Sequence, residues 1–292
     1  MLTESGAPDN IDAWIGIAIV IASVLTAWLM NTRAPKVRVF GTVLAALGCF
    51  SVVAWFVGVL GTGVLEDPKP NQTPMDSAKP ALMWIQAGIA LIAGLMLTWA
   101  AIKQLGDTSE LDLPLENEEE RFGFASRMLH WTTAILFLSL FPLGMFASMI
   151  PEGAWFRNYY YVIHKSIGVL VFILLFVRLI WNRRSKRPEL DSSLKPGERK
   201  WAHRAHIALY VMLLAMPITG YMMTSYHGFP TYFFGLEFEP LVEKNDVYII
   251  WGTFHKYLFP YVLYIVLGAH IMGAMKHHFI DKHTTALKRM VG

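Results

Sequence analysis

Seven long apolar runs constrain this chain more than any other feature of its sequence. The hydrocarbon core of a bilayer is about 30 Å thick, and an α-helix needs about 20 apolar residues to cross it. Because lipid offers the backbone no hydrogen bonds, segments of this length cross it as helices. We therefore expect an all-α integral membrane protein with seven transmembrane helices, at approximately Ile11–Met30, Val39–Leu60, Ala81–Lys103, Ser126–Met149, Tyr160–Trp181, His206–Ser225 and Tyr248–His277.

The Lys and Arg residues are distributed unevenly between the two ends of these spans. If the N-terminus lies outside, 19 of the 25 fall in inner segments and six in outer ones, whereas Asp and Glu divide 11 and 11. This asymmetry follows the positive-inside rule and predicts an outer N-terminus and an inner C-terminus. The net charge of +3 is thus sorted by side and does not indicate a nucleic-acid partner.

Composition divides the chain into three parts. Residues 1–105 hold three spans with no histidine and no charge deep in an apolar run, so we expect a packing or docking module, with a lipid or quinone pocket as the alternative. Residues 106–120 are acidic and contain Pro114, which is typical of a linker. Residues 121–292 hold the other four spans. Cys49 is the only cysteine, which excludes disulfides within the chain and Cys-ligated clusters.

The last span carries a histidine near each end. His255 and His270 are 15 residues apart, which corresponds to about 22 Å along an α-helix and about 60° around it. Both imidazoles therefore face broadly the same side, at different depths. Ionisable residues within a membrane are costly and indicate function, although two interfacial histidines that only hydrogen-bond are the alternative for this helix alone.

Two further histidines match these depths. The topology places His130 near the inner surface, like His270, and His164 near the outer surface, like His255. Bis-histidine ligation of haem iron leaves no open position and suits electron transfer. Zinc would need three or four ligands at one point, and each level offers two clear ones. No GxGxxG, P-loop or CxxCH motif is present, so neither nucleotide binding nor c-type haem is indicated.

Four stretches and a short tail motif carry a family resemblance: RMLHW, HKSIGVLVFILLFVRLIW, AHRAHIALYVMLLAMPITGY and HKYLFPYVLYIVLGAHIMGAMKHHF, followed by LKRM. Together they resemble the bacterial cytochrome b561 family, a four-helix membrane di-haem fold related to the cytochrome b subunits of hydrogenases and formate dehydrogenases. The resemblance covers roughly 121–292. It implies two haem b groups, axial ligands at His130, His164, His255 and His270, and a bacterial inner membrane with a periplasmic N-terminus and a cytoplasmic C-terminus.

The sequence departs from the family pattern in two ways. The family usually spaces its last two ligands by 14 residues, whereas 15 separate His255 from His270 here. A helical bulge near Pro260 would absorb the extra residue. The second departure is the three-helix N-terminal extension, which the four-helix family core lacks.

Other residues near the expected cofactors are candidates for supporting roles. Arg127 could pair with a carboxylate at a haem edge, and Gly168 would leave room for a flat macrocycle, whereas Arg178 mainly sets topology. His277 and His278 are quinone candidates, with interfacial anchoring as the alternative. His206 is a hydrogen-bonding or quinone-site candidate, with haem ligation as a further alternative.

The resemblance implies an oxidoreductase that transfers electrons between the quinone pool and a donor or acceptor on the outer side. Some family members resemble superoxide oxidases, which deliver electrons to ubiquinone, but the acidic outer side would rather favour a cationic partner such as a periplasmic cytochrome. A haem-bearing accessory or anchor subunit of a larger respiratory or photosynthetic complex is another alternative, docked through the N-terminal helices. A transporter is disfavoured because no deep carboxylate or broken, charged span is present.

Overall fold

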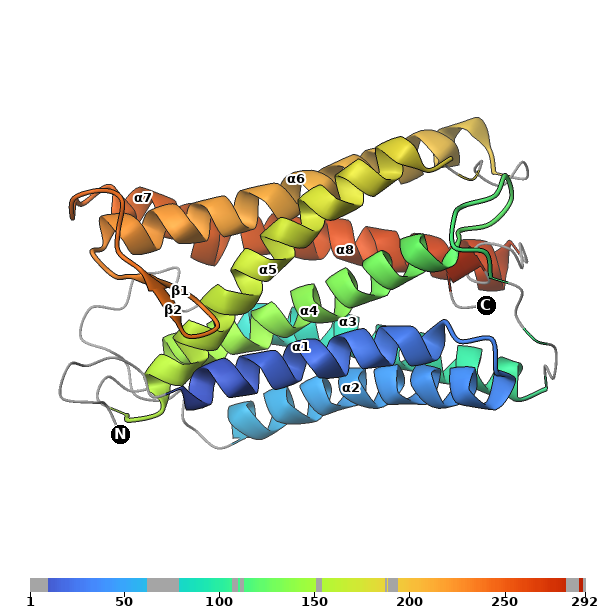
Figure 1. The fold of residues 1–292 in the computed structure, drawn as a ribbon, viewed down its shortest axis with the longest axis horizontal. Coiled ribbons are helices and arrows are strands. Elements are labelled where there is room, and N and C mark those ends of the chain that lie inside the picture. The colour runs from blue at the N-terminus through green and yellow to red at the C-terminus, as the bar shows by residue number, and fades with distance from the viewer. Residues whose placement is uncertain are drawn as a thin grey trace.

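The computed structural model describes residues 10–61, 79–106, 110, 113–150, 154–186, 188, 194–281 and 289–290. Of the described residues, 79% are helical, and seven helices of this part are long and apolar enough to cross a membrane. They run side by side along one axis (Figure 1). The prediction of an all-α integral membrane protein with seven spans is confirmed.

Six spans are single helices and the seventh is composite. The single helices are α1 (Ile11–Met30), α2 (Pro35–Gly61), α3 (Lys79–Leu105), α4 (Phe124–Met149), α5 (Arg157–Arg184) and α6 (Pro196–Tyr226). The last span runs without a break through α7 (Tyr248–Thr253), the π-helical turn η2 (Phe254–Leu258), α8 (Phe259–Met275) and a second π-helical turn, η3 (Lys276–Ile280).

The π-helical turn η2 contains His255 and ends two residues before Pro260. A π turn accommodates one extra residue within a helix. Fifteen residues here therefore cover the distance and rotation that 14 cover in a regular α-helix. The expected bulge is confirmed, and it keeps His255 on the same side of the span as His270.

Helix α6 begins earlier than its apolar run. The sequence predicted a start at His206, but the helix begins at Pro196. Proline is favoured in the first turn because its missing N–H is not needed there, and the Glu198 carboxylate accepts a hydrogen bond from the Lys195 backbone N–H at 3.0 Å. The first turns of α6 therefore extend beyond the apolar band and bring Glu198 toward the end of the last span.

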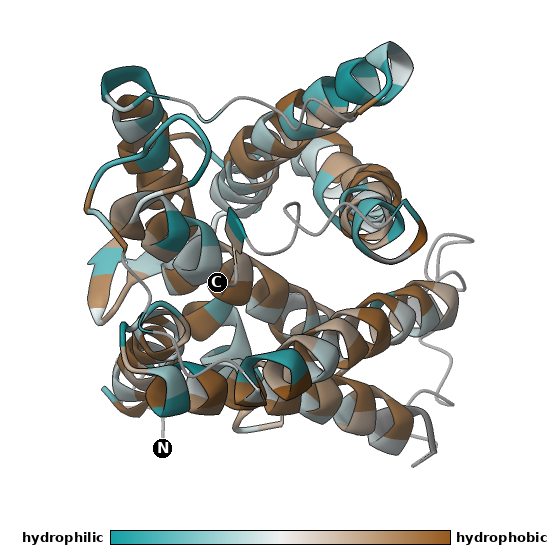
Figure 2. Ribbon diagram, turned by 90° about the vertical axis from the view of Figure 1, so that its right-hand side faces the viewer, coloured by the Kyte–Doolittle hydropathy of each residue, from teal (hydrophilic) through white to brown (hydrophobic). Residues whose placement is uncertain are grey.

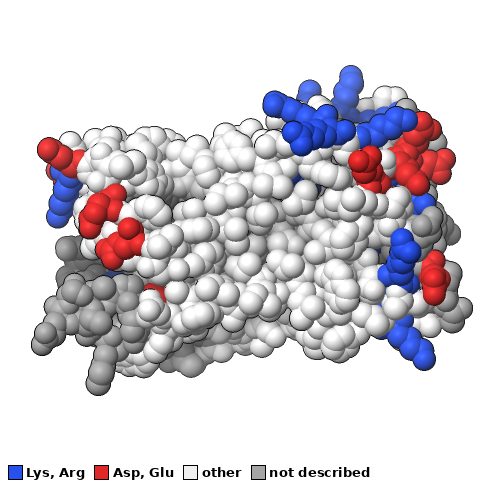
Figure 3. Space-filling view, viewed as in Figure 1, with Lys and Arg blue, Asp and Glu red and all other residues white. Residues whose placement is uncertain are grey.

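Polar and charged residues gather at the two ends of the molecule. Hydrophobic residues dominate the helices away from their ends, and hydrophilic residues dominate the helix ends and the connections (Figure 2). The face in Figure 3 has a broad uncharged band between its charged ends, with Lys and Arg clustered where α5 ends and α6 begins. This distribution is that of a protein surrounded by lipid along its middle.

The N-terminal helices pack against the other four. Helix α1 contacts α4 and α5, and α3 contacts α8. Buried polar links join them: Arg127 Nε donates to Asn31 Oδ1 at 2.6 Å, and Gln86 Nε2 donates to the Tyr264 hydroxyl. The N-terminal module is therefore attached along the bundle by specific contacts within the described residues.

A short hairpin covers part of the end of the bundle that holds His164 and His255, which the Lys/Arg distribution predicts to be the outer end. Strands β1 (Thr231–Phe233) and β2 (Leu236–Phe238) pair antiparallel, and the turn between them takes positive φ at Phe234 (47°) and Gly235 (90°). The Phe234 N–H donates to Ser166 Oγ at 3.1 Å, and Lys165 Nζ donates to the Pro230 carbonyl at 2.7 Å. The aromatic loop that carries the hairpin thus lies against the end of α5 that holds His164.

Candidate functional site

The outer pair of histidines is brought together across the bundle. His164, on α5, and His255, on η2, have ring centroids 6.1 Å apart, and the rings are nearly perpendicular at 82°. This is the pair that matching depths predicted.

Each outer histidine is held by a carbonyl and a glycine of a neighbouring helix. His164 Nδ1 lies 2.9 Å from the Leu140 carbonyl of α4, and His255 Nδ1 lies 2.9 Å from the Met216 carbonyl of α6. An Nδ1–H that donates to a carbonyl leaves the Nε2 lone pair free for a metal. Both rings thus have the same kind of partner, a backbone carbonyl of a neighbouring helix.

The glycine of each arrangement lies four residues beyond the carbonyl. A Cβ added at Gly144 would lie 2.7 Å from His164 Cε1, and one added at Gly220 would lie 2.7 Å from His255 Cε1. No larger residue fits without moving an imidazole. The sequence analysis gave Gly144 no role, although a glycine at matching depth in two spans was the available signal.

The inner pair is brought together as well, with different neighbours. His130, on α4, and His270, on α8, have ring centroids 6.4 Å apart. His206 lies beside them, with its ring centroid 5.2 Å from that of His270. Three histidines therefore lie together at this depth. The depth argument from the sequence paired His130 with His270 and did not place His206 beside them.

Arg178 contacts one histidine of the inner pair. Its Nη2 lies 3.1 Å from His130 Nδ1, and its guanidinium lies over the Tyr210 ring, 5.4 Å from the centroid. A guanidinium only donates hydrogen bonds. If His130 binds a metal through Nε2, its Nδ1 carries the proton, and Arg178 must then donate to another acceptor. The expectation that Arg178 mainly sets topology missed this contact.

The spacing of both pairs fits a metal ion between the rings. An imidazole centroid lies about 1.1 Å from its nitrogens, and a metal–nitrogen bond is about 2.0–2.1 Å. Two opposed imidazoles on one metal therefore have centroids roughly 6.3 Å apart, beside the 6.1 and 6.4 Å found here.

Two expected supporting residues have distinct surroundings. A Cβ at Gly168 would meet no protein atom within 4 Å, which agrees with the space expected beside His164. Arg127 is 2% exposed and turns toward Asn31 of α1, while its Nη2 has no hydrogen-bond partner among the described residues. Its expected pairing with a cofactor carboxylate stays a prediction.

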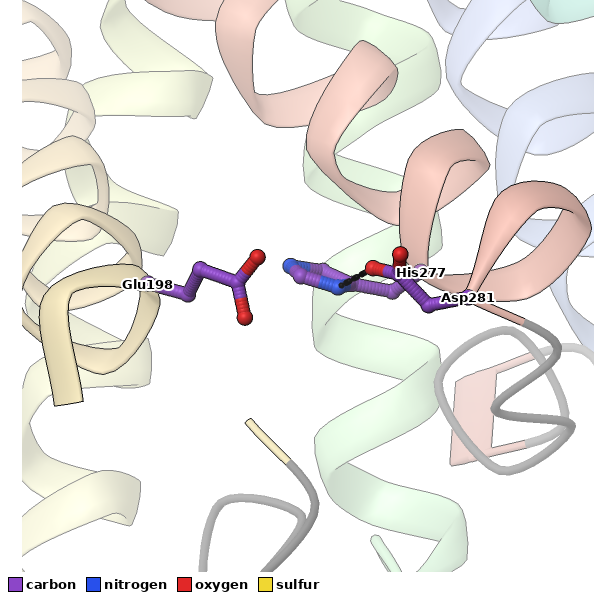
Figure 4. A group of neighbouring side chains, drawn as sticks. All are labelled: Glu198, His277 and Asp281. Carbon is purple, nitrogen blue, oxygen red and sulfur yellow. Dashed lines mark hydrogen bonds and ion pairs between the residues drawn. The ribbon is translucent and has the colours of Figure 1, made fainter. Parts of the chain in front are cut away.

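The quinone candidates at the inner end differ in accessibility. His278 is 9% exposed and packs edge-on against Trp99 of α3, with ring centroids 4.5 Å apart. His277 points from η3 toward α6, and its Nδ1 lies 2.9 Å from Asp281 Oδ2 (Figure 4). His277 is therefore the more open of the two.

A polar cluster surrounds His277. Lys276 Nζ lies 2.7 Å from Glu198 Oε1 of α6 and 2.7 Å from Asp281 Oδ2. Hydrogen bonds from Lys276 and then His277 lower the pKa of the Asp281 carboxyl below its ordinary value. The sequence analysis did not identify Glu198 or Asp281. The available signal for Asp281 was its position four residues beyond His277, which places both on one helix face.

Seven membrane-spanning helices with two opposed histidine pairs define a class: helical membrane proteins built to hold metal cofactors between their helices. Comparison with known sequences gives the family. Residues 121–292 match the family model described as prokaryotic cytochrome b561, and the chain belongs to this family. It is a multi-pass bacterial membrane protein, a b-type cytochrome of electron transfer.

Individual relatives agree with this assignment. The chain is 34% identical over 181 residues to cytochrome b561 homolog 2 of Escherichia coli K12, a match that covers 60% of this chain and 94% of that protein. It is 28% identical over 171 residues to cytochrome b561 homolog 1 of the same organism, covering 58% and 97%. It is 24% identical over 163 residues to the probable superoxide oxidase CybB of Yersinia pestis, covering 56% and 91%. The family model leaves the N-terminal three-helix module uncovered.

Proposed function

We propose that this protein binds two haem b groups and transfers electrons between the quinone pool and a partner on the outer, periplasmic side. His164 and His255 would hold the outer haem, and His130 and His270 the inner one. The observation that carries this proposal is the separation of the two ring pairs, 6.1 and 6.4 Å. Bound haem b supplies one-electron chemistry without an open coordination position.

The chain's own residues fix the orientation of the ligands. The carbonyls of Leu140 and Met216 hold the outer imidazoles by their Nδ1 atoms. At the inner level, Arg178 and His206 flank the pair. A cation beside the inner pair stabilises added negative charge and so favours the reduced state there. This difference would bias electrons toward the inner end.

We propose that quinone exchanges electrons with the protein at the inner end, near His277. This residue lies seven positions beyond His270, about two turns nearer the cytoplasm under the topology that the Lys/Arg distribution predicts. Imidazole can donate a hydrogen bond to a quinone carbonyl and exchange protons near neutral pH. His278 is the weaker candidate because Trp99 covers it, and His206 is next to be tested.

Superoxide oxidation is the second candidate for the outer half-reaction. It is favoured by the similarity to the probable superoxide oxidase CybB of Yersinia pestis. Lys256 is exposed beside His255, and Lys165 follows His164 directly, so an anion would meet positive charge near the outer pair. The overall acidic outer side favours a cationic protein partner instead.

The choice between outer partners can be tested by rapid-mixing spectroscopy on purified protein with oxidised haem. An enzymatic superoxide source should reduce the haem only in the absence of superoxide dismutase if superoxide is the donor. Reduction by a reduced c-type cytochrome, with superoxide giving none, would assign the outer side to a protein partner. The haem-quinone half is tested with added quinone and His277→Ala, which should slow electron exchange about tenfold while leaving haem content unchanged.

A further inference from the structure

The cluster around His277 joins two elements that are far apart in the sequence. Glu198 comes from the first turn of α6, and Lys276, His277 and Asp281 come from the end of the last span. Ligand atoms of Glu198, His277 and Asp281 lie within 4.8 Å of one another. In Figure 4 the His277 ring lies between the two carboxylates, with Asp281 on one side and Glu198 facing it across the gap between the helices.

The cluster is placed between water and the bundle. The side chains of Glu198, Asp281 and His277 are 26%, 24% and 16% exposed. All three side chains are therefore partly exposed to water, and the two carboxylates are more exposed than the imidazole.

The cluster places two carboxylates beside one imidazole. Among the described residues, the charged groups facing His277 are Glu198 from α6 and Lys276 and Asp281 from its own segment. Carboxylates and imidazole can both take part in proton transfer, so His277 has neighbours that can resupply a proton.

A metal ion is a weaker occupant of the same residues. The three ligands could converge on a divalent cation, but the Lys276 ammonium already lies 2.7 Å from a carboxylate oxygen on each side. A metal ion would have to displace this resident cation from both carboxylates. The geometry therefore favours proton exchange over metal binding.

We propose that Glu198, Lys276 and Asp281 form the proton-input site of the quinone reaction, with His277 as the group that passes the proton on. Asp281 fixes the His277 ring through Nδ1, and both Asp281 and Glu198 exchange protons with water. Lys276 ties the two carboxylates together, and with them α6 and the last span. This inference rests on the proposed quinone function of the same site.

Reduction of a quinone to a quinol takes two electrons, which a bound inner haem b would supply one at a time, and two protons, one for each carbonyl oxygen. His277 gives a proton to the carbonyl oxygen beside it and regains one from water through the carboxylates. The other carbonyl oxygen takes its proton from water. Quinol oxidation uses the same groups in reverse.

The test measures quinone reduction by the full-length holoprotein against pH, in H₂O and D₂O, with a water-soluble ubiquinone analogue. Glu198→Gln and Asp281→Asn keep hydrogen-bonding groups of the same shape but exchange no protons, and Asp281→Glu restores a carboxylate. The matched control is Glu119→Gln, which breaks another inner-surface ion pair, at 2.8 Å from Lys186. Haem spectra and the rate of haem reduction by dithionite should be unchanged in every variant.

We expect Glu198→Gln and Asp281→Asn to slow quinone reduction roughly threefold to tenfold, most at high pH, and to raise the solvent isotope effect, because proton delivery becomes limiting. Asp281→Glu and Glu119→Gln should behave like the parent protein. If His277→Ala slows the reaction but the two carboxylate variants keep the parent rate and pH profile, the proton-input site is wrong and the quinone site stands. If His277→Ala has no effect, the proposed quinone site fails, and the proton-input site fails with it.

Discussion

Gly144 and Gly220 set how closely the outer histidines approach their neighbouring helices. The contact distances of 2.7 Å to an added Cβ leave no room for even an alanine methyl group. The histidine ring would have to move, and with it the direction of Nε2. A small residue that carries no chemistry therefore controls the geometry of a proposed ligand.

The first residue-scale prediction is that Gly144→Ala disturbs the outer haem selectively. The added methyl group collides with the His164 ring and displaces it from the Leu140 carbonyl. Visible spectra should show loss or shift of one haem component with the other intact. Gly88→Ala on α3 is the control, because a Cβ there meets no atom within 4 Å. Equal spectra for Gly144→Ala and Gly88→Ala would refute this steric account.

A second residue-scale prediction concerns the pH dependence of stability. The folded-state pKa of Asp281 is lowered by hydrogen bonds from Lys276 and His277. A lowered carboxyl pKa contributes stability that is fully present above the unfolded value of about 4 and is lost as pH falls through the lower folded value. Thermal midpoints should therefore show an Asp281-dependent loss only below about pH 4. In Asp281→Asn this loss should disappear. If the thermal midpoint of the variant falls below about pH 4 as it does in the parent protein, Asp281 is not the group responsible.

At the scale of elements, the π-helical turn η2 sets the register of the last span. Because it contains one more residue than an α turn, deleting Leu258 should convert it to α-helix and keep His255 facing the same side as His270. Deleting Ile265 from the regular part of α8 should instead rotate His255 by about 100° relative to His270.

Both deleted side chains are exposed, Leu258 at 48% and Ile265 at 73%, so little core packing is lost in either variant. We expect the Leu258 deletion to retain both haem components and the Ile265 deletion to lose one. Spectra of the purified variants measure this directly. Loss of a haem from the Leu258 deletion alone would show that the π turn has another role.

The sequence predicted the elements well because the length of each span, and the depth of each histidine in it, depend on that span alone. The seven spans and the depths of His130, His164, His255 and His270 follow from hydropathy and the Lys/Arg distribution. Contacts that depend on how neighbouring helices rotate against each other were not readable. The place of His206 beside His270, and the early start of α6 at Pro196, belong to this second kind.

At the scale of the whole molecule, the N-terminal module is bound to the bundle by contacts that avoid the paired histidines. Those contacts involve Arg127, Tyr264 and His278, whereas in the described part of the chain the hydrogen-bond partners of the paired histidines come from α4, α5, α6 and the last span. The module could therefore dock a partner without being part of the cofactor sites.

We predict that a truncated protein starting near Glu116 still binds both haems. Its thermal midpoint should fall, because buried Arg127 and Tyr264 lose their partners Asn31 and Gln86. Haem quantification and thermal unfolding of the truncated and full-length proteins measure the two effects separately. If the truncated protein folds and inserts but binds no haem, the module supports the cofactors and the division near residue 120 is wrong.

The central claim is the pairing of four histidines into two haem sites, and a redox-titrated visible spectrum with haem counted per chain tests it most directly. The full-length protein should carry two non-covalent b-type haems. His164→Ala and His255→Ala should each remove the same component, and His130→Ala and His270→Ala should each remove the other. One haem per chain in the full-length protein, or loss of the same component from His130→Ala and His255→Ala, would contradict the account.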